Sequence, residues 1–218
     1  MILNMKRITI VLVVLVLALS RSVGQNVYIN PDLLQNDWSA KWITHPNITG
    51  EEQGVYLFKK EIELSQKPKS FVINISADNR YVIFVNGTVA GRGPTRGDLK
   101  RWLFETIDIA SYLTGGENHI AVKVWNMANL KPVAQMSHQT GLIIQANSPK
   151  EKDINTNKSW KVTKDEAYSF YKIKHLKRYY ASGPGEKFTG ANHPWHWQTS
   201  TSTAWKTAKV GENGQSLR

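Results

Sequence analysis

Polar side chains gather around one short stretch of the sequence and could bind a hydroxylated ligand together. Asn79 and Arg80 come just before an apolar run, whereas Arg92 and Asp98 follow the turn that ends it. Trp102 comes next and offers a flat apolar face. Ligand sites combine such a face with a few fixed polar groups. We therefore predict that these five residues form a carbohydrate site; alternatively, Asn79 caps a turn and Arg80 pairs with an acid.

The eight Trp residues of the chain lie in different surroundings. Trp125 and Trp160 lie in strand-like runs, so we assign them to the core. Trp195 and Trp197 lie in a Pro-containing, loop-like segment that begins at His193. An aromatic ring in such a loop can offer its face to the C–H groups of a sugar. We therefore expect these two side chains to form a surface platform.

No motif for catalysis or metal binding can be recognised. His193 and His196 are three residues apart, but no third zinc ligand lies near them. A nucleophile elbow, a Gly-rich phosphate loop and a zinc-protease helix are all missing from the sequence. Glycoside hydrolysis needs two carboxyl groups across the scissile bond, and nothing in the sequence points to such a pair. We therefore assign no catalytic residue, no metal and no cofactor.

Short β-strands separated by turns must position these side chains. Apolar alternation and β-rich runs predict strands at residues 55–64, 71–75, 81–85, 88–90, 120–124, 141–145 and 160–162. Asn86 and Gly87 form the dipeptide that best tolerates the positive φ angles of a type I′ hairpin. Helical periodicity is weak, although residues 109–113 could form one turn capped by Asp108. The pattern predicts an all-β sandwich or jelly roll, with residues 150–200 as long loops.

The first 24 residues have the features of a secretory signal peptide. Lys6 and Arg7 precede an apolar run at residues 8–19, and small residues follow at 22–24. The run is too short for a stable membrane span, which needs about 20 residues; an uncleaved anchor is the alternative. We predict an exported protein, periplasmic or extracellular, whose residues 25–218 form the β-sandwich domain.

The chain is basic and has no Cys. Its formal charge of +11 falls to +8 when Lys6, Arg7 and Arg21 leave with the signal peptide. Export argues against nucleic acid as a partner, whereas an acidic polysaccharide stays open. The densest basic group is Lys172, Lys174, Lys177 and Arg178, and a solvated face is the simpler interpretation of it. Without disulfides, a hydrophobic core must stabilise the fold.

An ordered set of motifs resembles the N-terminal β-sandwich region of bacterial α-L-rhamnosidases. Residues 38–43 (WSAKWI) resemble the opening W-x-A-x-W-I of that family, and residues 76–87 are similar to its S-A-D-N-R-Y-x-x-x-V-N-G hairpin. Further similar segments are residues 92–98, 105–109, 124–126, 183–186 and 205–208. The resemblance covers nearly all of residues 25–218, but residues 195–197 read WHW where WGW is expected.

The resemblance implies a galactose-binding-like jelly roll in front of a second β-region and an α-helical barrel that carries the catalytic carboxylates. The chain is then expected to be truncated before that catalytic domain and inactive by itself. It would be a non-catalytic carbohydrate-binding or scaffolding module of an enzyme that hydrolyses terminal α-L-rhamnosides. Its expected partners are rhamnose-containing or plant polysaccharide glycans and the downstream catalytic domain. A free-standing carbohydrate-binding or adhesion protein is the alternative.

Overall fold

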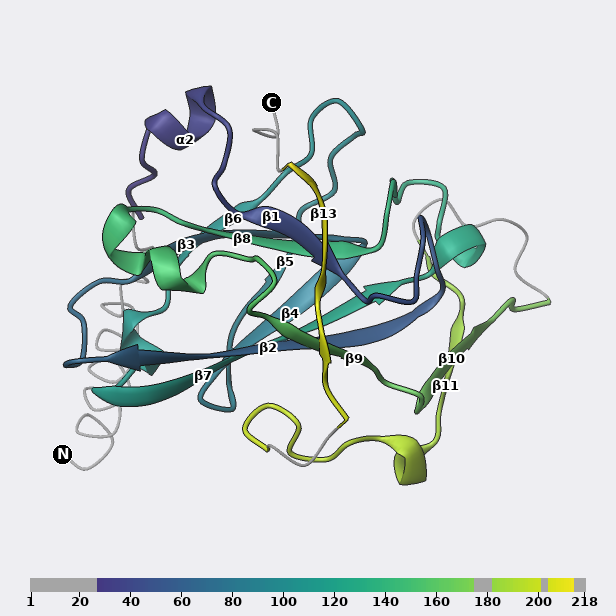
Figure 1. Cartoon of the computed structure of the whole chain (residues 1–218). Helices are drawn as coiled ribbons and strands as arrows, with labels where there is room; N and C mark the ends of the chain where they lie inside the picture. The colour runs from purple at the N-terminus through teal and green to yellow at the C-terminus, as the bar shows by residue number, and fades with distance from the viewer. Residues whose placement is uncertain (1–26, 175–181, 201–203, 214–218) are drawn as a thin grey trace, which may run out of the picture.

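Two antiparallel β-sheets pack face to face and enclose the core (Figure 1). The computed structural model describes residues 27–174, 182–200 and 204–213, so the predicted signal peptide lies outside the described residues. The predicted all-β sandwich is confirmed. In this described part of the chain, no helix has the length and apolar character needed to cross a membrane.

The first sheet has five strands in the order β13-β1-β8-β3-β6. Its strands are β1 (Lys41–Thr44), β3 (Val72–Asp78), β6 (Glu105–Asp108), β8 (Gly141–Ala146) and β13 (Lys209–Asn213). Side chains alternate across β3: Ile73 and Ile75 face the core, whereas Ser76 faces outward. This sheet therefore has an outer face of its own, to which loops can attach.

The second sheet has six strands in the order β12-β9-β2-β7-β4-β5. Its strands are β2 (Gly54–Leu64), β4 (Arg80–Val85), β5 (Thr88–Gly93), β7 (Gly116–Asn126), β9 (Lys161–Lys164) and β12 (Lys206–Thr207). The long central strands β2 and β7 pair over their full length. The predicted alternation in β7 is confirmed, because Ile120, Val122 and Val124 all belong to the core cluster.

The predicted hairpin turn between β4 and β5 is confirmed. Asn86 and Gly87 have φ angles of 50° and 79°, as a type I′ turn requires. The Asn86 side chain fixes the turn to its surroundings: its Nδ2 donates to the Tyr112 carbonyl (3.0 Å), and its Oδ1 accepts from the His119 backbone N–H (2.9 Å). The predicted helical turn is the 3₁₀ helix η1 (Ala110–Tyr112). Other short helices are α2 (Asp32–Gln35), η2 (Ala128–Leu130), η3 (Pro149–Ile154) and η4 (Gly190–Asn192).

The sequence predicted long loops at residues 150–200, but this segment also contains strands. These are β9 and a two-stranded ribbon of β10 (Tyr168–Tyr171) and β11 (Gly185–Phe188). Phe170 of the ribbon and Trp197 pack on Val55 and Leu57, which face outward from the six-stranded sheet. We call the described residues 165–174 and 182–200 the cover, because they shield this face. Its strands are four residues long and lack clear alternation, which is why periodicity missed them.

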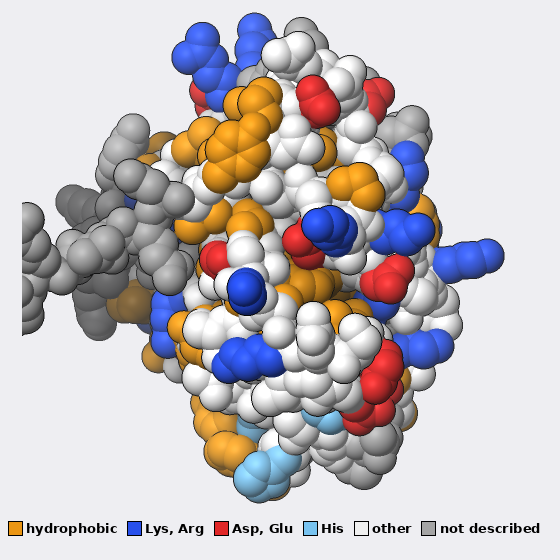
Figure 2. Space-filling view, turned by 90° about the vertical axis from the view of Figure 1, so that its left-hand side faces the viewer, with side chains coloured by type: hydrophobic (Ala, Val, Ile, Leu, Met, Phe, Trp, Pro, Cys, Tyr) orange, Lys and Arg blue, Asp and Glu red, His pale blue; other side chains and the backbone are white. Residues whose placement is uncertain are grey.

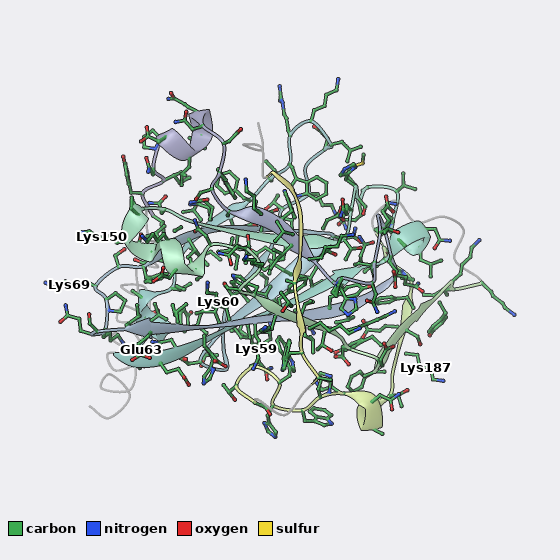
Figure 3. All side chains as sticks on the ribbon, in the orientation of Figure 1. Lys59, Lys60, Glu63, Lys69, Lys150 and Lys187 are labelled. Carbon is green, nitrogen blue, oxygen red and sulfur yellow. The ribbon has the colours of Figure 1, made fainter. Side chains whose placement is uncertain are left out.

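Charged side chains are spread over the outside of the sandwich. Lys60 and Glu63 project from β2, whereas Lys187 lies on β11 at the opposite side from Lys150 (Figure 3). Lys59 of β2 differs because it is buried, and its Nζ donates to the Ser200 carbonyl at 3.1 Å. Such a scattered arrangement fits a solvated basic surface better than one concentrated patch.

Candidate functional site

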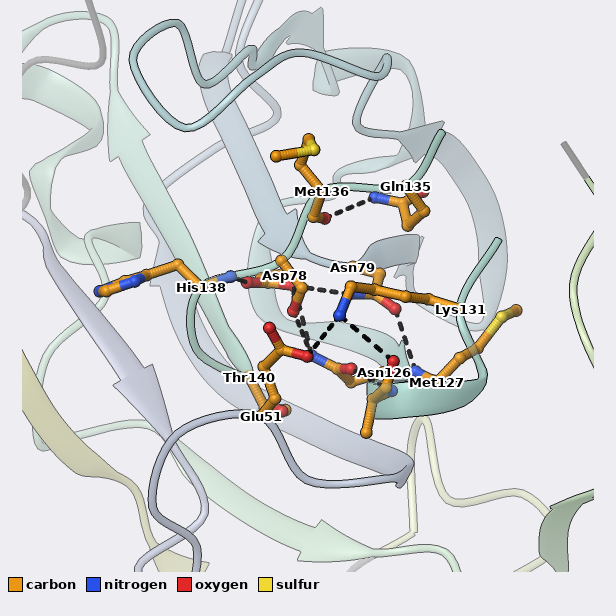
Figure 4. Close-up of polar contacts among 12 residues, drawn as sticks. Glu51, Asp78, Asn79, Asn126, Met127, Lys131, Gln135, Met136, His138 and Thr140 are labelled. Atoms are coloured by element: carbon orange, nitrogen blue, oxygen red, sulfur yellow. Dashed lines mark hydrogen bonds and ion pairs between the residues drawn. The ribbon is translucent and has the colours of Figure 1, made fainter. Parts of the chain in front are cut away.

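A buried acid organises the end of the sandwich where β3 passes into β4. Asp78 ends β3 and is almost fully buried. Its carboxylate accepts hydrogen bonds from Asn79 Nδ2 (2.6 Å), Ser137 Oγ (2.7 Å), Asn126 Nδ2 (3.2 Å), and the backbone N–H groups of His138 (2.6 Å) and Gln139 (2.8 Å). Figure 4 shows this network. Burial raises the pKa of the Asp78 carboxyl, although the hydrogen bonds act in the opposite direction.

Asn79, the first predicted site residue, is part of that network and is buried. Its Oδ1 accepts from the Met127 backbone N–H at 3.0 Å, and its own N–H donates to the Trp125 carbonyl at 3.1 Å. The side chain therefore ties the start of β4 to the segment that follows β7. Asn79 therefore has a structural role, but its partner Met127 is 48 residues away in the chain and does not belong to a local turn.

A groove lies beside this network. It has a volume of about 930 Å³ and runs between residues 129–137 and the segments 172–174 and 182–184. Leu130 and Val133 give it an apolar wall, and Ser137 joins it to the Asp78 network. Three Lys side chains line it: Lys131, which contacts Glu51 at 2.6 Å, and the exposed Lys172 and Lys174. The other members of the predicted basic group, Lys177 and Arg178, lie outside the described residues.

Arg80 and Arg92 lie on the outer face of the six-stranded sheet. Arg80 begins β4 two residues before Val82, and alternation puts both side chains on the side away from the core. Arg92 of the edge strand β5 stands directly opposite Val82, so it projects to the same side. Arg80 is half-buried opposite Trp125, whereas Arg92 is exposed.

Asp98 and Trp102 lie in the loop between β5 and β6, and Trp102 contacts the five-stranded sheet. Trp102 Nε1 donates to Ser76 Oγ (3.1 Å) on the outer face of the five-stranded sheet, and its ring meets Trp42 edge-on at 6.2 Å. Asp98 closes its own turn, accepting from the backbone N–H groups of Lys100 (2.8 Å) and Arg101 (2.9 Å).

The five predicted site residues therefore do not converge on one point. Asn79 is buried, the two Arg side chains face outward from one sheet, and Trp102 packs on the outer face of the other. Whether any of them contacts a sugar stays a prediction. We predicted that they lie together because they flank one hairpin in the sequence. The side chains of successive residues in a β-strand point to opposite faces, so nearness in sequence did not bring them to one surface.

A cluster of aromatic rings forms a second candidate surface on the cover. We call Tyr168, Phe188, His193 and Trp195 the aromatic platform. Neighbouring rings lie 4.7–6.3 Å apart, mostly edge to face. Trp195 is 63% exposed and Phe188 43%. Figure 2 shows hydrophobic side chains beside His at the lower edge of the molecule.

The prediction of a surface platform is right for the exposure of Trp195 and wrong for Trp197. Trp197 is only 2% exposed, because it packs on the six-stranded sheet and meets Phe84 edge-on at 5.7 Å. Trp160 is in the core, as predicted, whereas Trp125 is half-buried on the outer face of that sheet. Phe188 and Tyr168 were missed, because the ribbon strands are four residues long and lack clear alternation.

Comparisons with known proteins agree with this fold. No family model matches the chain. An α-L-rhamnosidase of Streptomyces avermitilis is 25% identical over 153 residues, which cover 60% of this chain and 14% of that protein. The structure of a GH78-family rhamnosidase of Bacillus sp. GL1 matches 80% of this chain and 18% of its own, with 23% identity and a TM-score of 0.69.

The chain has the fold of a β-sandwich region of α-L-rhamnosidases. The α-L-rhamnosidase of Dictyoglumus thermophilum agrees, with 21% identity, a TM-score of 0.60, and coverage of 80% of this chain and 21% of its own. The resemblance noted in the sequence is thereby confirmed. The chain spans between about one seventh and one fifth of the length of these rhamnosidases.

Metal-binding groups do not gather in the part of this rhamnosidase-like sandwich that the structure describes: no set of three or more His, Asp or Glu side chains is placed to hold an ion. His193, one of the two His residues considered above, has its Nδ1 2.7 Å from Asp165 Oδ2. That contact orients the His193 ring within the aromatic platform.

Proposed function

We propose that the chain is a non-catalytic, carbohydrate-binding or scaffolding module of an exported α-L-rhamnosidase-like glycoside hydrolase. The observation that carries the proposal is the likeness to the Bacillus rhamnosidase over 80% of this chain. Because the match takes up only 18% of that enzyme, most of such a protein would lie outside this sandwich. The module would pack on the catalytic domain of its parent protein and hold rhamnose-containing or plant polysaccharide glycans near it.

Two acids of the sandwich, Glu105 and Asp108, support a non-catalytic role because they bind groups of the fold itself. Glu105 accepts from the Thr95 backbone N–H (2.6 Å) and from the Tyr81 hydroxyl (3.2 Å). Asp108 accepts from the Phe71 N–H at 2.9 Å. A glycosidase needs one acid free to protonate the leaving group and a second acid across the scissile bond. Carboxylates engaged in this way suit structure better than proton transfer.

Two measurements, of glycosidase activity and of sugar binding, distinguish a non-catalytic binding module from a glycosidase. Chain purified free of host glycosidases is assayed for nitrophenol release from an aryl α-L-rhamnoside, and we expect none. The same chain is titrated with rhamnose-containing oligosaccharides, and we expect weak, saturable binding with a dissociation constant of about 1 mM, or roughly −4 kcal/mol. Turnover that disappears when one Asp or Glu of the chain is replaced would overturn the non-catalytic role.

A further inference from the structure

The outer surface of the aromatic platform does not pack on the six-stranded sheet and does not line the groove. Buried aromatic rings on the cover, such as Phe170 and Trp197, pack on the six-stranded sheet and hold the cover in place. Trp195 and Phe188 differ because they present large areas to solvent, 63% and 43% of their surfaces. Exposed aromatic rings packed against one another call for an explanation beyond stability.

The Trp195 ring is held by several contacts before any ligand arrives. Its Nε1 donates to the Gly190 carbonyl at 3.0 Å, and its ring meets His193 edge-on at 4.7 Å. His193 is held in turn by Asp165, whose buried carboxylate lies 2.7 Å from Nδ1. Phe188 meets the Trp195 ring at 6.2 Å and a nearly perpendicular angle. A ligand that stacks on Trp195 therefore loses little affinity to ordering of the site.

The surroundings of the platform suit a sugar ring better than a protein surface. Asn192, which precedes His193 in the chain, is exposed and polar, whereas Lys187 precedes Phe188 in β11 and points to the opposite face of the ribbon. A standard protein interface buries about 800 Å² on each partner and has an apolar centre. One indole with the edge of one Phe is too small for such a centre. It matches a single pyranose, whose C–H face is apolar and whose rim carries hydroxyl groups.

We propose that the aromatic platform is a binding site for a pyranoside, whose apolar C–H face stacks on the exposed Trp195 ring. The proposal rests on the proposed glycan-binding function and assigns it a place on the molecule. That place is the cover of the six-stranded sheet. None of the platform's four residues lines the groove beside Asp78 or belongs to the five residues that sequence grouped together.

The test uses the indole N–H signals of the whole chain in ¹H–¹⁵N spectra. The Trp195 signal is assigned from its loss in Trp195→Phe, and methyl α-L-rhamnopyranoside is added up to tens of millimolar. We expect the Trp195 signal to shift saturably while those of the buried Trp160 and Trp197 stay in place. Trp195→Ala should weaken binding by about tenfold or more, equivalent to about 1.4 kcal/mol. Trp195→Phe, which keeps an aromatic face, should weaken it less.

Lys172→Ala serves as the matched control, because Lys172 is exposed in the groove and should not affect this site. Equal binding by Trp195→Ala and the unaltered chain would place the sugar elsewhere and overturn the inference, but leave the proposed function standing. Complete absence of saturable shifts would remove both the site and the glycan-binding role. Concentration-dependent broadening that Trp195→Ala abolishes, without sugar-dependent shifts, would identify the platform as a protein contact and overturn the inference. Unchanged Trp160 and Trp197 signals in each variant establish that the fold is intact.

Discussion

Asp78 shows how one buried acid can organise the end of a β-sandwich. Its carboxylate gathers donors from its neighbour Asn79, from β7 and from residues 137–139. A buried carboxylate is tolerated only when such donors surround it. The network also holds one side of the groove in place, because Ser137 both donates to Asp78 and lines the groove.

Replacing Asp78 with Ala should therefore destabilise the fold strongly. The substitution leaves side-chain and backbone donors buried without an acceptor, and we expect a loss of about 3 kcal/mol in the free energy of unfolding. Urea denaturation monitored by Trp fluorescence measures it. Glu63→Ala, which removes an exposed acid of β2, is the control and should change stability by less than about 0.5 kcal/mol. Similar values for the two variants would contradict the structural role of the network.

Sequence could locate Asp78 and Asn79 at a strand end but could not predict their burial. Their partners Asn126 and Ser137 are 48 and 59 residues away from Asp78 in the chain. No periodicity or turn signal connects positions so far apart. Asn79 was therefore expected at a ligand, whereas the fold uses it to hold the segment after β7.

At the scale of elements, the hairpin between β4 and β5 depends on Gly87. Its φ of 79° lies in the left-handed region, which a β-branched side chain resists. We expect Gly87→Val to lower the free energy of unfolding by about 1 kcal/mol or more. Thr88→Val, one residue further along in β5, is the control and should be nearly neutral. A melting temperature that stays the same in Gly87→Val would contradict the turn.

Strands were predictable where alternation ran long enough to be recognised. The runs now seen as β2, β4 and β7 have six to eleven residues and a clear apolar face. The ribbon strands β10 and β11 have four each, and β12 has two. Such short segments gain their structure from the sheet beneath them, so their own sequence carries little signal.

Trp195 and Trp197 provide a matched test of the cover. Trp197 is buried on the six-stranded sheet, and Trp197→Ala leaves a cavity that should cost about 3 kcal/mol of unfolding free energy. Trp195→Ala removes a largely exposed ring and should cost less than about 1 kcal/mol. Chemical denaturation of the two variants under identical conditions makes the comparison. Equal losses of unfolding free energy would contradict the difference in burial between Trp195 and Trp197.

At the scale of the whole molecule, the last described segment joins the two sheets. Residues 206–213 form β12 at the edge of the six-stranded sheet and then β13 at the edge of the five-stranded sheet. Between them, Ala208 is buried in the core, and its N–H donates to the Trp160 carbonyl at 2.9 Å. Figure 1 shows this segment in yellow, running from one sheet to the other. The segment therefore connects the two sheets at one side of the sandwich.

Ending the chain after residue 203 should consequently weaken both sheets together. The loss uncovers the backbone edges of β9 and β1, which now pair with β12 and β13, and opens the core at Ala208. Because free strand edges pair with other chains, we expect a lower melting temperature and aggregation on heating. Thermal melting with light scattering measures both effects. A chain ending after residue 213 keeps both strands and serves as the control. If the two chains have the same melting temperature and neither scatters light, residues 206–213 do not stabilise the sandwich. The remaining strands would then be sufficient to specify it.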